Sequence, residues 1–77
     1  MSSVGLNASN VAFIVRRKKV IKALKAANAY SEDTAVKLED TTINAPTKFK
    51  NVNRYMIKKG QMKQTEDGRF YLTEKEK

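Results

Sequence analysis

The chain has 77 residues, of which 40% are hydrophobic and 31% are charged, a balance typical of one small globular domain. It contains no cysteine and no histidine, which excludes disulfides, thiolate chemistry and the commonest zinc ligands. Sixteen Lys and Arg residues against eight Asp and Glu residues give a net charge of +8, which indicates a polyanionic partner such as nucleic acid or an anionic membrane surface.

Charge is unevenly distributed along the chain. Residues 1–30 carry a net charge of +6, residues 31–46 carry −3 and residues 47–77 carry +5. Two basic segments therefore flank an acidic one, and this order constrains how the molecule can face a polyanion.

No segment of the sequence is predicted to cross a membrane. The longest apolar run, residues 11–15, is much shorter than the roughly 20 residues that a transmembrane helix needs. This run precedes a basic cluster, the reverse of the order in a secretory signal, so the protein is expected to be cytoplasmic. The folded domain is expected to span residues 11–73, between a flexible N-terminal segment, residues 1–10, and a charged tail, residues 74–77.

A helix is predicted over residues 17–29. Apolar residues recur there with helical spacing and form one stripe: Val20, Ile21, Leu24 and Ala27. If this helix ran back to Val11, Arg17 would lie in the middle of the stripe, where a charge is costly unless it is paired. A break is therefore expected near residue 16, and residues 11–15 are expected to form a short strand or an offset helical turn.

Two further helices are predicted. Ser31 is a good N-cap for a short helix over residues 32–39, whose first turn carries two carboxylates that the helix dipole favours. Asn44 is expected to cap a third helix, with Pro46 in its first turn and Gly60 in the left-handed position that ends it. The inner face of this third helix is predicted to hold Phe49, Val52, Met56 and Ile57. Its outer face is predicted to hold Thr47, Lys50, Asn51, Arg54 and Lys58, with Tyr55 at the edge.

The C-terminal part of the domain is predicted to be a β-hairpin, with strands over residues 61–65 and 69–73. A two-residue turn would leave Leu72 opposite Lys63, whereas a three-residue turn with a left-handed Gly68 pairs Met62 with Leu72. The three-residue turn gathers the apolar side chains of Met62, Phe70 and Leu72 on one face. Because burial of one apolar face decides strand register, the three-residue turn is preferred.

The order of helix, short helix, helix, glycine and hairpin resembles the winged helix-turn-helix superfamily. In residues 55–73 a hydrophobic helix end, a Lys-Lys-Gly stop, a basic strand, a glycine turn and an aromatic strand follow one another as in that family. The resemblance covers residues 16–73, and the chain is also similar to small archaeal winged-helix proteins of unassigned role. It implies an α+β fold, namely a three-helix winged helix-turn-helix with a C-terminal β-hairpin wing.

The resemblance also implies a DNA-binding protein and transcriptional regulator, with the third helix in the major groove and the wing on the DNA backbone. Carried over position by position, it assigns Thr47, Lys50, Asn51, Arg54 and Lys58 to the reading helix, and Lys63 and Arg69 to the wing. The basic run Arg16, Arg17 and Lys18, with Lys19, is either a further phosphate contact or the solvated start of a helix.

Other hypotheses remain open beside DNA binding. The carboxylates at residues 32–33 and 39–40 would repel phosphates unless they face away or pair with residues 16–19. The alternative function is therefore a winged-helix module that binds another protein without binding DNA. The apolar N-terminal segment, above all residues 11–15, is the candidate contact for a homodimer, and it is also the candidate for peripheral contact with an anionic membrane.

The sequence does not favour an enzyme. It offers neither His nor Cys as base or nucleophile, and it has no glycine-rich loop for a phosphate. The two carboxylate pairs are each adjacent in sequence, so the members of a pair diverge around a helix instead of converging. No cofactor and no metal ion is expected.

Overall fold

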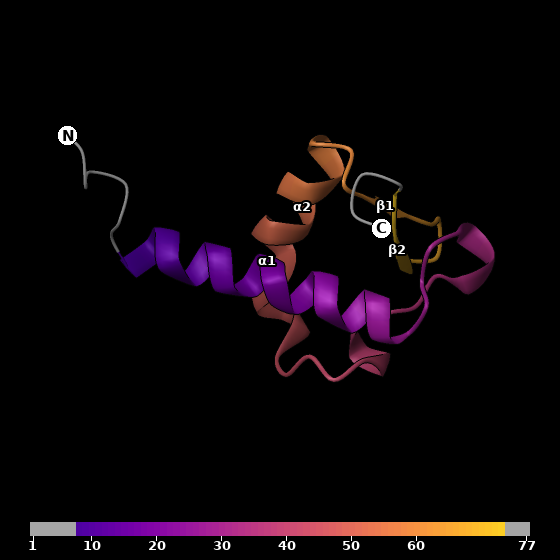
Figure 1. Cartoon of the computed structure of the whole chain (residues 1–77), viewed down its shortest axis with the longest axis horizontal. Helices are drawn as coiled ribbons and strands as arrows, with labels where there is room; N and C mark the ends of the chain where they lie inside the picture. The colour runs from indigo at the N-terminus through magenta and orange to yellow at the C-terminus, as the bar shows by residue number, and fades with distance from the viewer. Residues whose placement is uncertain (1–7, 74–77) are drawn as a thin grey trace.

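The computed structural model describes residues 8–73, which form a small α+β domain of two α-helices and one two-stranded antiparallel sheet. The α+β class predicted from the sequence is therefore confirmed. In chain order the elements are helix α1 (Ala8–Ala26), the 3₁₀ turns η2 (Glu32–Thr34), η3 (Leu38–Asp40) and η4 (Pro46–Phe49), helix α2 (Lys50–Lys58), and strands β1 (Met62–Gln64) and β2 (Phe70–Leu72). Figure 1 shows α1 crossing α2, with the hairpin beside them.

Helix α1 is continuous, so the predicted break near residue 16 is wrong. Arg17 is only half-buried, and its Nε donates a hydrogen bond of 3.1 Å to Oε1 of Gln61, in the segment between α2 and β1. This polar contact offsets the cost of placing a charge beside the apolar stripe. Of the N-terminal segment predicted over residues 1–10, residues 8–10 form the first turn of α1, and residues 1–7 lie outside the described residues.

Both α-helices end in a Schellman motif. Gly60 occupies the left-handed position after α2 with φ 75°, as predicted, and Asn28 occupies the same position after α1 with φ 54°. The next amide donates to the carbonyl five residues earlier, at 2.9 Å in each case, from Ala29 to Leu24 and from Gln61 to Met56. Helix α1 therefore ends before residue 29, the predicted end, because Asn28 tolerates the left-handed conformation.

The predicted second helix over residues 32–39 does not form. Turns η2 and η3 flank the extended residue Val36, which exchanges two backbone hydrogen bonds with Phe70 of β2, at 3.0 and 2.7 Å. An isolated helix of eight residues is unstable in water, whereas a β-branched residue suits an extended bridge. The acidic segment is thereby held against the sheet.

Turn η4 leads directly into α2, and its start differs from the prediction. Ala45, not Asn44, is the residue that precedes the first turn, and it is left-handed with φ 52°. Pro46 stands in the first turn, as predicted.

The hairpin has the predicted register, with Met62 opposite Leu72 and Gln64 opposite Phe70. Gly68 is left-handed with φ 86°, as the three-residue turn requires. This register places the apolar side chains of the hairpin on the inner face of the domain. The buried core gathers side chains from both helices, the connecting segments and the hairpin: Val20, Leu24, Ala29, Leu38, Phe49, Val52, Met56, Met62, Phe70 and Leu72.

One predicted core position of α2 is wrong. Ile57 is 37% exposed, while Asn53, which the sequence did not mark as a core residue, is 9% exposed. The buried face of α2 is therefore rotated toward residue 53 relative to the face expected from the hydrophobic pattern.

Candidate functional site

The solvent side of α2 and η4 carries the polar residues expected there. All five predicted outer-face residues are exposed: Thr47, Lys50, Asn51, Arg54 and Lys58. Residues four apart in a helix lie on one side, so Lys50 and Arg54 are neighbours there. Residues 41–65 contain six Lys or Arg residues and no Asp or Glu. This part of the molecule therefore has a positive charge that no carboxylate within the segment neutralises.

A hollow of about 290 Å³ lies between this face and the hairpin. It is lined by residues of both elements: Lys50, Asn53, Arg54, Ile57, Gln64 and Phe70. The Oδ1 atom of Asn53 is buried and has no hydrogen-bond partner among the described residues. A buried acceptor without a partner lowers the stability of a fold by about 1–3 kcal/mol. The hydrophobic pattern of the sequence did not indicate that Asn53 is buried.

The predicted wing residue Lys63 is exposed, but it does not join the α2 face. Its neighbour Gln64 lines the hollow beside α2. Successive side chains of a strand point to opposite faces, so Lys63 points away from the face that carries Gln64.

Arg69, the other predicted wing contact, takes part in an intramolecular network. Its Nε donates to both carboxylate oxygens of Asp67, at 3.0 Å each, and the hydroxyl of Thr65 donates to the same carboxylate. Its Nη1 lies 3.4 Å from the carbonyl oxygen of Glu32 and 3.5 Å from that of Ala35. The guanidinium thus connects the hairpin turn to the acidic segment, and the interpretation of Arg69 as an exposed phosphate contact is not supported.

The hydrogen bond from Thr65, followed by that from Arg69, lowers the pKa of Asp67 from 3.8 to about 2. Because the folded-state pKa is depressed, the carboxylate stabilises the fold above about pH 4. This contribution is lost as the pH falls toward 2.

We expect a carboxyl-carbon NMR titration to give a midpoint near 2 for Asp67, and the Thr65→Val variant to raise it toward 3.8. The Thr47→Val variant, which removes an exposed hydroxyl elsewhere, should leave it unchanged; an ordinary midpoint in the wild type would contradict the network.

The basic run at the middle of α1 does not form one site. Consecutive residues of a helix are rotated by about 100°, so their side chains diverge. Arg17 contacts Gln61, Arg16 is half-buried on another side of the helix, and Lys18 is exposed. The side chains of this run therefore do not act together as one phosphate contact.

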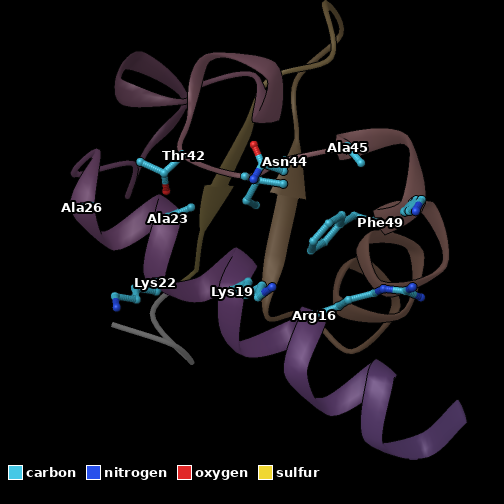
Figure 2. Close-up of a pocket in the computed structure, with 11 residues that line it drawn as sticks. Arg16, Lys19, Lys22, Ala23, Ala26, Thr42, Asn44, Ala45 and Phe49 are labelled. Atoms are coloured by element: carbon cyan, nitrogen blue, oxygen red, sulfur yellow. The ribbon is translucent and has the colours of Figure 1, made fainter. Parts of the chain in front are cut away.

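Arg16 instead lines a groove of about 610 Å³ between α1 and residues 42–49, named here the α1 groove. Figure 2 shows Arg16 and Lys19 on the α1 wall, with Thr42, Asn44, Ala45 and Phe49 on the opposite side. Lys19, Lys22 and Lys48 also line the groove. Sequence reasoning did not assign Lys22 or Lys48, although the spacing of residues 16, 19 and 22 indicates one side of a helix.

Within residues 8–73, no cluster of three or more His, Cys, Asp or Glu residues is arranged to hold a metal ion. In the same part of the chain, no helix is both long enough and apolar enough to span a membrane. The chain was compared with family models, curated proteins and solved structures, and it matches none of them.

Proposed function

We propose that this protein binds double-stranded DNA through the exposed side of α2 and acts as a winged-helix transcriptional regulator. The observation that carries the proposal is the α2 face itself, where Lys50, Asn51, Arg54 and Lys58 are all exposed. Arginine and lysine pair with guanine edges or phosphates, and asparagine pairs with adenine. Val52 and Met56 anchor the other side of the helix in the core, which gives the exposed residues a rigid support.

The order of elements supports the same proposal. Helix α1, helix α2 and the hairpin follow one another in the order that the proposal requires for the first helix, the reading helix and the wing. The chain differs from the winged helix-turn-helix family at the second helix, because 3₁₀ turns stand in its place. In this proposal α2 is the reading helix and the hairpin is the wing.

The position of turn η2 reduces one part of the objection to DNA binding, the part that concerns Glu32 and Asp33. Turn η2 contacts β2, whereas α2 contacts β1, so the hairpin lies between them (Figure 1). The carboxylates of Glu32 and Asp33 are therefore separated from the α2 face, and their repulsion of a duplex bound at α2 is reduced.

We expect a short random-sequence duplex to bind with an affinity that depends steeply on salt. About three phosphate contacts, from Lys50, Arg54 and Lys58, would weaken binding by roughly 40-fold between about 50 and 200 mM salt. Fluorescence anisotropy of a labelled duplex measures this change. No binding at the lower salt concentration would refute the proposal.

The exposed amino-terminal half of α1 favours a second function, which is self-association. Val11, Ile14 and Val15 are 50%, 48% and 43% exposed, and their spacing places them on the side of α1 away from Val20 and Leu24. This half of α1 projects beyond the rest of the described chain (Figure 1). We propose a second copy of the chain as the occupant, because the strip is uncharged and an isologous contact needs only one self-complementary patch.

Ile14→Asp is expected to abolish this self-association, because a carboxylate would be buried at the contact. Sedimentation velocity over a wide concentration range measures the dimer. Lys25→Asp, a change on the same helix outside the strip, should leave the dimer intact. A wild-type chain that stays monomeric at all concentrations would refute the dimer.

A further inference from the structure

The α1 groove has a wall of positive charge that no contact within the described structure neutralises. Arg16, Lys19 and Lys22 follow one another at intervals of three residues along α1, and Lys48 lines the same groove from η4. None of these four side chains has an ion pair recorded with another residue of the described chain, and no acidic residue of that chain lines the groove. The four cations repel one another, so an anion placed between them would lower the free energy of the groove.

The shape of the α1 groove favours an elongated anion over a single small ion. Three residues of a helix rise about 4.5 Å, so residues 16 to 22 cover about 9 Å of the helix axis along the groove. The volume of about 610 Å³ is within the range of sites for ligands of many atoms. A row of regularly spaced cations is complementary to a row of regularly spaced anions.

The chemistry of the individual side chains points to phosphate. Arg16 is half-buried, and a guanidinium is a planar donor that binds phosphate oxygens in pairs. Thr42 and Asn44 on the opposite wall offer further hydrogen-bond donors to oxygen atoms. The lining also includes small or apolar side chains, among them Ala23 and Phe49, which carry no charge that would compete with the anion.

We infer that the α1 groove binds a linear run of phosphates, held by Arg16, Lys19, Lys22 and Lys48. The phosphates belong either to the backbone of a nucleic-acid strand or to a free polyphosphate. This site is separate from the α2 face and does not depend on the proposed reading of DNA by α2. If the phosphates belong to DNA, the footprint of the protein extends from α2 past Lys48 to α1.

Inorganic tripolyphosphate and a short duplex are the two probes. The test variant is Lys19→Gln with Lys48→Gln, and its control is Lys25→Gln with Lys37→Gln, which removes the same charge from exposed positions outside the groove. We expect the control to bind tripolyphosphate like the wild type and the test variant to bind at least about tenfold more weakly, by calorimetry at low salt. In the wild type, amide NMR shifts on adding tripolyphosphate should be confined to residues 16–23 and 42–49.

The two probes distinguish the source of the phosphates. If the test variant binds both probes more weakly, or the duplex alone more weakly, the groove is assigned to a nucleic-acid strand. In that case the slope of log affinity against log salt concentration for duplex binding should fall by about two. Weaker binding of tripolyphosphate alone assigns it to a free polyphosphate. Equal binding of both probes by the test and control variants overturns the inference. A wild-type chain that binds tripolyphosphate in the groove but no duplex refutes the proposed function and leaves this inference standing.

Discussion

Replacing Leu24 with alanine is expected to lower the free energy of unfolding by about 3 kcal/mol. Leu24 is fully buried on the inner face of α1, near the C-terminal end of the helix, and a 77-residue chain has only a small core. A domain of this size has a stability of roughly 4–12 kcal/mol, so this loss is a large fraction of the total. The midpoint of thermal unfolding should fall by about 10–20 °C, measured by circular dichroism.

Ile57→Ala is the matched control. It also tests whether Ile57 is a core residue, as the sequence pattern predicted, or an exposed one, as in the structure. The pattern placed Ile57 in the core, whereas the structure leaves it 37% exposed. Truncation of a side chain that is this exposed should cost less than about 1 kcal/mol. Equal losses for Leu24→Ala and Ile57→Ala would contradict the observed orientation of α2.

Reversing two charges on α2, with Lys50→Glu and Arg54→Glu, is expected to weaken duplex binding by about 10²-fold or more. Each contact to a phosphate or a guanine edge contributes about 1–3 kcal/mol, and the introduced carboxylates repel the DNA. Both side chains are exposed, so the fold should survive the change. The salt dependence of the remaining affinity should be shallower by about two phosphate contacts.

The matched control for this experiment is Lys25→Glu with Lys37→Glu. Both variants lower the net charge of the chain by the same amount, so the long-range attraction to DNA changes equally. Lys25 lies near the end of α1 and Lys37 lies in the acidic segment, and neither lines the α1 groove or the hollow between α2 and the hairpin. If the control lost as much affinity as the α2 variant, binding would depend on net charge and not on the α2 face.

The register of the hairpin could be predicted from residues that are close together in the sequence. Its register follows from the alternation of Met62, Phe70 and Leu72 with polar residues and from the glycine at position 68. The end of α2 at Gly60 was predicted for the same kind of reason, since only a few neighbouring residues decide it. The exposure of Lys50, Asn51, Arg54 and Lys58 also followed from helical spacing.

The two largest errors concern residues whose partners are distant in sequence. Helix α1 passes through Arg17 because Gln61, 44 positions later, accepts a hydrogen bond from its guanidinium. The predicted second helix is lost because Phe70 offers Val36 a donor and an acceptor from β2. Local propensity cannot report either contact, because each partner is brought near only when the hairpin packs against the rest of the chain.

The sequence alone thus determined the α+β class, the hairpin and the cationic character of α2, because these depend on composition and on spacing within single elements. The tertiary structure decided which of the other charged side chains are hydrogen-bonded within the fold. It brought Arg69 to the carbonyl oxygens of Glu32 and Ala35 and Arg17 to Gln61, and it placed both Arg16 and Lys48 in the lining of the α1 groove. Whether a charged side chain is paired within the fold or available to a ligand depends on what the folded chain brings within hydrogen-bonding distance, and that is a property of the packed molecule.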